Sequence, residues 1–489
     1  MDRRIIQTLI GLLLLLAPLA GLAQPVSLRQ ALEMAKRRNE QILQKQEVLE
    51  QKKLADREAW GNFLPSVDLK ASYTHLNDPM QIDLNPIREA MIQLQAGNQT
   101  EFTNIYRLLQ GQAPLSNAER LAAFNAAAQQ LNSLLPEFVE TFKEQDYKTA
   151  TLVGVQPLFL GGKLWAAKKF AGAEKQAALA DKQVTENQVQ KQVVDLYLQT
   201  ALLKRVVETR ENVLAGMERH RQEAKRLIEE GLIPRYHLLR ADVAVANARR
   251  ALLQDQNNLA LAKLALKHAL GLTEETPLQI ADEMEFVPFT EDFATLKGKA
   301  VQSHPVLQLV SSKRKAASQK LVAERSAFLP QVAAFGKYEL YPEYLSSLEP
   351  RWAAGIQLSF NLFNGFKSYH RVQSARHLRR QVELMEKESR RKVDLWLESA
   401  WREVTNAQER YRKSQKDLAL AKENVRLNEK RFHSGLGTSL EVIDAHLMLE
   451  KTELEQLAAL YEYYSGLANL YAASGNTQKI LTIWEKKEN

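Results

Sequence analysis

The chain has 489 residues, no cysteine, and a formal net charge of +8 spread over stretches that mix Lys and Arg with Glu. The lack of cysteine excludes a disulfide framework, a thiolate metal site and a cysteine nucleophile. No basic stripe is interleaved with aromatic residues, so the charge indicates a solvated helical surface and gives no support to nucleic acid as a partner.

Residues 1–23 have the pattern of a secretory signal peptide. Arg3 and Arg4 precede an apolar run that extends through Leu16, and small residues around Ala23 suit cleavage before Gln24. The alternative, an N-terminal membrane anchor, would need a longer apolar run. We therefore expect the mature protein to start near Gln24 and to work outside the cytoplasm.

The first predicted elements are a helix and a strand. The segment from about Ser27 to Asn62 is predicted to be one helix, and it is followed by Phe63-Leu64-Pro65. From Val67 to Thr74 apolar residues alternate with polar ones, which predicts a strand with one apolar and one polar face. Such a strand of about ten residues can cross a membrane when it is tilted. A soluble, half-buried sheet shows the same alternation.

Residues of about 77–146 form an insert between the first two predicted strands. Asn85-Pro86 predicts the start of a helix, and Ser116 with Glu119 predicts a capping box. Apolar residues after it predict an amphipathic helix; they are Leu121, Phe124, Leu131, Leu134 and Leu135.

A second strand, from about Tyr147 to Val155, leads into a long helical segment from Lys163 to about Gly271. Apolar residues in this segment step by four and three, which is typical of a coiled coil; they include Val189, Val193, Leu196, Thr200, Leu203 and Val207. Gly231-Leu232-Ile233-Pro234 interrupts the segment. A glycine that ends one helix and a proline that begins the next predict a helical hairpin.

The second half of the chain repeats this series. A helix of about 293–327, strands at 332–340 and 352–362, and a helical segment of about 367–473 are predicted, the last broken at Gly435-Leu436-Gly437-Thr438. Leu158-Phe159-Leu160-Gly161-Gly162 returns as Leu362-Phe363-Asn364-Gly365, at an offset of 362 − 158 = 204. Gly231 and Gly435 have the same offset. We therefore divide the chain into a first repeat (24–291), a second repeat (292–475) and a tail (476–489).

The number of predicted strands indicates how many chains the assembly needs. Four strands cannot close a barrel, for which about eight is the practical minimum. Aromatic residues near the strand ends suit a membrane interface; they are Phe159, Trp165, Tyr338, Tyr341, Tyr344 and Trp352. An open sheet edge in lipid would cost several kcal/mol for each unpaired backbone group. If the strands span a membrane, several chains must therefore combine them.

In the order of its motifs the chain resembles the TolC-type outer-membrane efflux family. The resemblance covers almost the whole mature chain and rests on Phe63-Leu64-Pro65 and its copy Phe328-Leu329-Pro330, the two duplicated motifs above, and the hairpin sequence from Gly435 to Ala445. It implies an α+β membrane fold in a homotrimeric channel. Each chain would give four strands to a twelve-stranded β-barrel in the outer membrane, and its helices would give one third of a long periplasmic α-helical coiled-coil barrel.

The resemblance also implies a function and partners. The protein would be a passive exit duct across the outer membrane and periplasm, in tripartite efflux or type I secretion, working with a periplasmic adaptor and an inner-membrane pump. The turns that would dock the adaptor contain Gly231, Leu232, Gly435, Leu436 and Gly437. In that geometry the insert lies at the extracellular end, as a cap over the mouth or as an inert loop. The alternative function is a periplasmic coiled-coil scaffold with no channel activity.

Glu441 and Asp444 are the candidate pore residues. Their spacing of three places both on one helix face, and the resemblance implies that this face lines the narrow end of the pore. Rings of carboxylates in a trimer would favour cations. The alternative is that the two acids only complement the helix dipole. The first repeat has His237 and Arg240 at these positions, so any ring would come from the second hairpin alone.

No catalytic constellation is present in the sequence. The histidines are scattered without metal-ligand spacing, which favours solvated or packing roles. We expect no enzyme activity, no metal and no cofactor.

Overall fold

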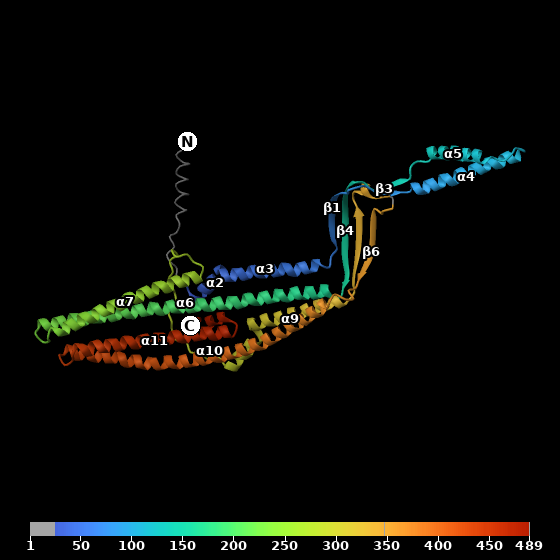
Figure 1. Cartoon of the computed structure of the whole chain (residues 1–489). Helices are drawn as coiled ribbons and strands as arrows, with labels where there is room; N and C mark the ends of the chain where they lie inside the picture. Colours follow the sequence, from blue (N-terminus) through green and yellow to red (C-terminus); the bar gives the residue numbers. More distant parts are fainter. Residues whose placement is uncertain (1–24, 347, 489) are drawn as a thin grey trace, which may run out of the picture. The chain divides into compact units, whose positions relative to one another are not determined.

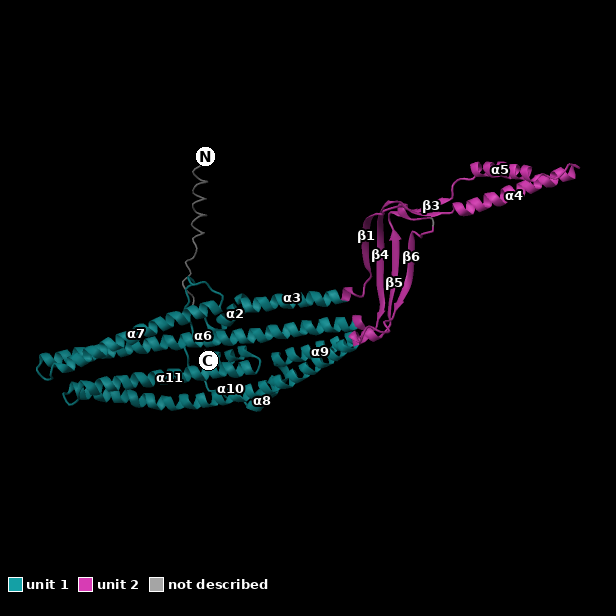
Figure 2. Ribbon diagram, in the orientation of Figure 1, with its two compact units in different colours: residues 1–59, 165–324, 369–489 teal, residues 60–164, 325–368 magenta. Residues whose placement is uncertain are grey.

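The computed structural model describes residues 25–346 and 348–488, so the predicted signal peptide lies outside the described residues. The chain divides into two compact units, coloured separately in Figure 2. We call residues 1–59, 165–324 and 369–489 the helical unit, and residues 60–164 and 325–368 the strand unit. Each unit is therefore assembled from segments that lie far apart in the sequence.

The helical unit consists of long helices joined by tight turns (Figure 1). The two longest helices, α6 and α10, have 67 residues each, and each runs beside the helix that follows it. The helices are α2 (Leu28–Arg38), α3 (Glu40–Gly61), α6 (Lys163–Glu229), α7 (Tyr236–Ala269), α8 (Phe293–Ser303), α9 (Pro305–Arg325), α10 (Lys367–His433), α11 (Ser439–Ala473) and α12 (Leu481–Trp484). Short 3₁₀ turns lie at Thr477–Ile480 and Glu485–Glu488 of this unit, and at Ser326–Phe328 and Pro342–Tyr344 of the strand unit.

Both predicted helical hairpins are confirmed, as α6 with α7 and α10 with α11, but the two shorter predicted helices are each divided. Asn39 separates α2 from α3 because its backbone is extended and its side-chain Oδ1 accepts a hydrogen bond from the backbone N–H of Gln41, at 3.0 Å. His304 separates α8 from α9. It precedes Pro305, and the ring of a proline disfavours helical backbone at the residue before it.

The core of the helical unit is rich in tyrosine. Tyr197 of α6 and Tyr463, Tyr464 and Tyr471 of α11 are buried, and they pack with leucines of α2, α10 and α11. The hydroxyl of Tyr463 donates to the carbonyl oxygen of Val287 at 2.6 Å. The buried rings therefore hold the segment between α7 and α8, which has little regular structure, against the helices.

Asp282, in that same segment, accepts three hydrogen bonds through one carboxylate oxygen. The donors are the backbone N–H of Leu28, the hydroxyl of Tyr197 and the indole Nε1–H of Trp484, each at 2.9 Å. They come from α2, α6 and α12, so one side chain links the start, the middle and the end of the described chain.

We expect Asp282→Asn to lower the stability of the helical unit by about 1–2 kcal/mol, because a neutral acceptor forms weaker hydrogen bonds than a carboxylate. Thermal unfolding followed by near-ultraviolet circular dichroism would show a lower midpoint. Asp417→Asn, at an exposed position on α10, is the matched control. An unchanged midpoint for Asp282→Asn would show that the linkage contributes little.

The strand unit contains a four-stranded antiparallel sheet in the order β1-β4-β5-β6. The strands are β1 (Ser66–His75), β4 (Asp146–Leu160), β5 (Gln331–Glu339) and β6 (Trp352–Ser359). The register pairs Leu69 with Leu152, Leu152 with Tyr338, and Tyr338 with Trp352. Since directly paired residues share a face, the register joins the apolar sets of all four strands on one face of the sheet.

The opposite face carries most of the polar side chains, together with Val153, Val155 and Phe335. Lys70 pairs with Thr151, and Thr151 pairs with Glu339. The hydroxyl of Thr151 donates to the Glu339 carboxylate at 2.6 Å. The predicted two-faced strands are therefore confirmed, and β4 extends further than predicted, to Leu160.

The insert folds into a small ribbon and a helical hairpin. β2 (Met80–Asp83) pairs with β3 (Val139–Lys143), and between them lie α4 (Asn85–Leu109) and α5 (Asn117–Leu134). The predicted capping box is confirmed, since the Ser116 side chain and Glu119 each accept a hydrogen bond from the other's backbone N–H. The sequence predicted α5 as an amphipathic helix, but the structure buries only Ala127 of it and leaves Leu121 and Leu134 exposed, because little of the helix is covered by a neighbouring element. Of α4 the sequence predicted only the start.

None of the described helices combines the length and the apolar character that a membrane-crossing helix requires.

Candidate tip site at the two helical turns

The two helical hairpins end in turns with the same backbone geometry. Gly231 and Gly435 have φ angles of 75° and 72°, a conformation that favours glycine. The N–H of Leu232 donates to the carbonyl oxygen of Leu227, and the N–H of Leu436 donates to that of Arg431, both at 2.9 Å. This hydrogen bond is typical of a helix that ends at a left-handed glycine. The duplication seen in the sequence therefore extends to the turns.

Each turn carries an exposed leucine beside exposed polar residues. The side chains of Leu232 and Leu436 are 65% and 77% exposed. Gly437 differs from the other two turn glycines, because a Cβ atom there would lie 3.0 Å from the backbone nitrogen of Phe432. Each turn therefore presents one leucine to solvent, and Gly437 allows the second turn to fold back closely on α10.

Glu441 caps the helix that follows the second turn. The backbone N–H of Thr438 donates to its carboxylate at 2.7 Å, and Arg431 lies 3.5 Å from the other carboxylate oxygen. The hydrogen bond from Thr438 and the positive charge of Arg431 lower the pKa of Glu441. Asp444, one turn further along α11, is exposed. The structure thus gives the two predicted acids different environments.

The first hairpin has no acid at the equivalent positions. His237 is buried and its ring stacks on Tyr236, with ring centroids 4.2 Å apart. Arg240 also lies over the ring of Tyr236, with its guanidinium 5.8 Å from the ring centroid. Burial and the nearby Arg240 charge lower the pKa of His237.

The two hairpins are joined beneath their turns by His220, which the sequence did not identify as a site residue. Its Nε2 lies 2.6 Å from the hydroxyl oxygen of Ser439, and its ring lies 4.7 Å from that of Phe432. Burial, and then the charges of His446 and His237, lower the pKa of His220 to about 4. A small apolar cluster next to it contains Ala224, Leu227, Phe432 and Val442, from both hairpins.

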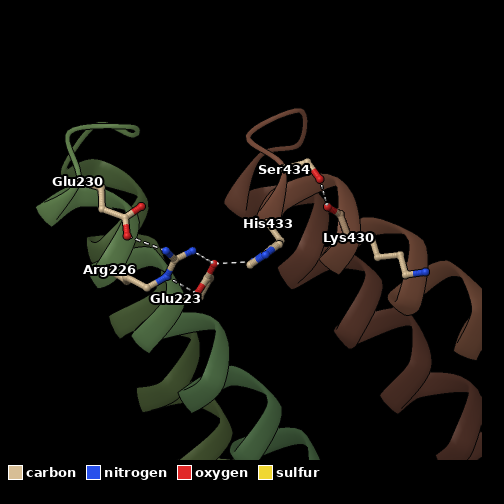
Figure 3. A network of polar contacts seen from close by, with 6 residues as sticks. All are labelled: Glu223, Arg226, Glu230, Lys430, His433 and Ser434. Carbon is tan, nitrogen blue, oxygen red and sulfur yellow. Dashed lines mark hydrogen bonds and ion pairs between the residues drawn. The ribbon is translucent and has the colours of Figure 1, made fainter.

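A polar network also connects the hairpins, as Figure 3 shows. Arg226 lies 2.7 Å from Glu223 and 2.6 Å from Glu230, and His433 of α10 lies 2.9 Å from Glu223. The hydrogen bond from Arg226 lowers the pKa of Glu223 to about 2. The spacing of Glu223, Arg226 and Glu230 could have been found in the sequence, but His433 is 210 residues away from its partner.

An apolar groove of about 950 Å³ lies below the turns, between α6, α7 and α11. Its wall includes Met217, Leu239, Val243, Ile443 and Leu447, and Arg210 is one of its polar lining residues. Arg210 makes ion pairs with Asp255 and Glu450. Within residues 25–346 and 348–488, no group of three or more His, Cys, Asp or Glu side chains could hold a metal ion.

Comparison with known proteins relates this architecture to one family. Residues 140–272 and 296–476 match the model of the outer membrane efflux protein family. Protein CyaE of Bordetella pertussis is 26% identical over 296 residues, which are 59% of this chain and 62% of CyaE. The match thus spans less than two thirds of that relative's length.

Solved structures share the fold. The outer membrane protein VceC of Vibrio cholerae superposes with a TM-score of 0.70 at 17% identity, over 92% of this chain and 96% of VceC. The MtrE outer membrane channel of Neisseria gonorrhoeae, in its open state, superposes with a TM-score of 0.68 at 16% identity, over 92% of this chain and 89% of MtrE. From the family match and this shared fold, the chain belongs to the outer membrane efflux protein family and is located in the cell outer membrane, from which it extends into the periplasm.

Proposed function

We propose that three copies of this chain form a passive exit duct of a tripartite efflux or type I secretion system. The observation that carries the proposal is the sheet of the strand unit. One of its faces is largely apolar, with Lys148 and Gln156 of β4 as polar exceptions, and its outer strands β1 and β6 each pair on one side only within the described chain. Such a sheet is stable in lipid only if its edges are closed by other copies, and three copies give a twelve-stranded barrel.

The helical unit supplies the rest of the duct in this proposal. Its two hairpins have the length and the heptad spacing that suit the wall of a coiled-coil barrel in the periplasm. The turns, with Leu232 and Leu436 exposed, would dock a periplasmic adaptor that connects to an inner-membrane pump. The apolar groove below them suits a helix of that adaptor. The periplasmic scaffold alternative has no support from the family match.

Single-channel recording of the purified protein in a planar lipid bilayer tests the duct. We expect a steady conductance, because a closed trimer leaves a water-filled path. If the protein is trimeric by light scattering but never gives conductance, the duct proposal fails.

We expect Asp444→Asn to weaken the cation preference of the channel by roughly threefold or more, because three exposed carboxylates would be lost from one ring. Glu441→Gln should change selectivity less, because the Glu441 carboxylate is already engaged by Thr438 and Arg431. Reversal potentials in a salt gradient measure both effects. Asp417→Asn controls for the loss of one negative charge elsewhere in the helical unit. Equal selectivity in all variants would exclude the acidic ring and leave the duct in place.

A further inference from the structure

Helix α4 of the insert has two faces, and only one of them is covered. Every fourth residue packs towards α5 and is buried, namely Arg88, Ile92, Ala96, Thr100 and Asn104. On the other side lie six large apolar side chains that are at least half exposed, namely Ile87, Met91, Leu94, Phe102, Ile105 and Leu109. We call these six residues, together with the exposed Asn98 between them, the α4 outer stripe.

The α4 outer stripe has the spacing of a coiled-coil seam. Successive members are separated by four, three, four, four, three and four residues. At 100° per residue all seven fall within an arc of about 80°, so they form one straight band along the helix. The one polar member, Asn98, is in the middle. A single asparagine in such a seam fixes the register and the number of helices, because it pairs with its own copy.

The basic side chains of the hairpin formed by α4 and α5 are engaged within it, and this limits which partner the stripe can bind. Arg107 lies 3.4 Å from Glu119, and Arg120 lies 3.1 Å from Glu101. Arg88 donates to the carbonyl oxygens of Asn132 and Leu135, at 2.8 and 2.7 Å. The hairpin contains no lysine. A helix that binds an anionic lipid surface needs free basic side chains, and here all three arginines are engaged.

We propose that the α4 outer stripe is a self-association surface, through which the α4 helices of neighbouring copies pack as a parallel three-helix bundle with Asn98 facing Asn98. This inference rests on the proposed trimer. Chain connectivity supports it, because β2 and β3 attach the hairpin to the paired ends of β1 and β4, at His75 and Asp146. When the sheets of neighbouring copies pair edge to edge into a closed barrel, the α4 helices lie around the axis of that barrel and all run in the same direction. This arrangement raises the effective concentration of each helix for the others.

The attachment to the barrel favours the bundle, because it brings the three α4 helices together. The stripe extends over 23 residues, a rise of about 33 Å along the helix, and a helix in a protein gains most of its stability from packing against other elements. The bundle is therefore expected to form with the barrel, as an ordered structure continuous with its extracellular end.

Cysteine cross-linking tests the proposal, because the natural chain has no cysteine. Asn98→Cys in the full-length protein, in outer-membrane vesicles, should give disulfide-linked dimers on mild oxidation. Gln93→Cys is the matched control, since Gln93 is exposed on the same helix, five residues earlier and about 140° round from Asn98. We expect cross-linking at position 98 to be at least tenfold faster than at position 93. Adding Leu94→Glu and Phe102→Glu should abolish the cross-link at 98, and neither side chain is part of the buried face.

Light scattering of the detergent-solubilised protein separates this inference from the proposed function. A trimer without a cross-link at position 98 would overturn the self-association surface and leave the duct in place. A monomer would overturn both. Equal rates at positions 98 and 93 would indicate random collisions and would also overturn the self-association surface. If the thiol of the Asn98→Cys variant were protected from maleimide without cross-linking, another molecule would cover the stripe, and the self-association surface would again be overturned.

Discussion

Tryptophan at both Gly231 and Gly435 is expected to abolish export while the protein still folds and assembles. An added Cβ atom at either glycine meets no described atom within 4 Å, so a large side chain would project outwards from the turn. The left-handed backbone costs about 1–2 kcal/mol for each non-glycine residue. The long helices on either side of each turn can bear this cost, whereas a partner docked on the turns would be displaced.

The insert offers a matched control for this experiment. Gly111 lies between α4 and α5, has a φ of 77°, and is also free of described neighbours within 4 Å of an added Cβ. Gly111→Trp therefore introduces the same strain and the same side chain away from the hairpin turns. Export would be measured in cells without the native protein, as drug tolerance or as released cargo, and assembly would be measured by light scattering. Normal export in the double variant would exclude docking at the turns.

Acid is expected to loosen the junction between the two hairpins. The pKa of His220 falls from 6.5 to about 4 in the folded protein. Between these two pH values the side chain is therefore neutral in the folded protein but protonated in the unfolded chain. The contribution of His220 to the free energy of unfolding is complete above pH 6.5 and is lost as the pH is lowered towards 4. The full loss is about 3 kcal/mol for each chain. His237, whose pKa is also lowered, acts in the same direction.

The neighbouring acid acts in a different pH window. The pKa of Glu223 is lowered to about 2, so its contribution is complete above pH 4.5 and is lost only as the pH falls further. Between pH 6.5 and 4.5 the effect of acid should therefore come from the buried histidines.

Hydrogen exchange, corrected for the intrinsic pH dependence, measures this local opening. Protection of amides in the last turns of α6 and the first turns of α11 should fall on the order of 100-fold as the pH is lowered from 7 to 4. His220→Gln should flatten the dependence, whereas His433→Gln should not, because the His433 side chain is 72% exposed. Peptides from residues 85–134, which contain no histidine, give an internal reference. Equal acid sensitivity in both variants would exclude His220 as the cause.

The two hairpins share the geometry of their turns but differ in the residues that follow them. Both hairpins have the same glycine turn, yet the residues that follow it are His237 and Arg240 in one and Glu441 and Asp444 in the other. In the first hairpin they pack against Tyr236, whereas in the second Glu441 completes a helix cap and leaves Asp444 exposed. This difference is why the selectivity prediction depends mainly on Asp444.

The sequence alone determined the local structure of this protein. Heptad spacing predicted the helical hairpins, alternation predicted the two-faced strands, and Gly231 and Gly435 predicted the turns, because each of these patterns depends on residues close together in the chain. The duplication and the order of motifs identified the family. The sequence missed the division of two helices at Asn39 and His304, where a capping side chain and a following proline end the helix.

Only the tertiary structure decided which faces meet. His220 and Ser439 are 219 residues apart, and Asp282 joins α2, α6 and α12, so no local pattern could indicate either contact. The sequence also treated Glu441 and Asp444 as one pair, although Thr438 and Arg431 engage only the first. The α4 outer stripe became visible once the packing against α5 showed which side of the helix is covered. Contacts of this kind depend on how distant segments pack, and periodicity along the chain does not specify that.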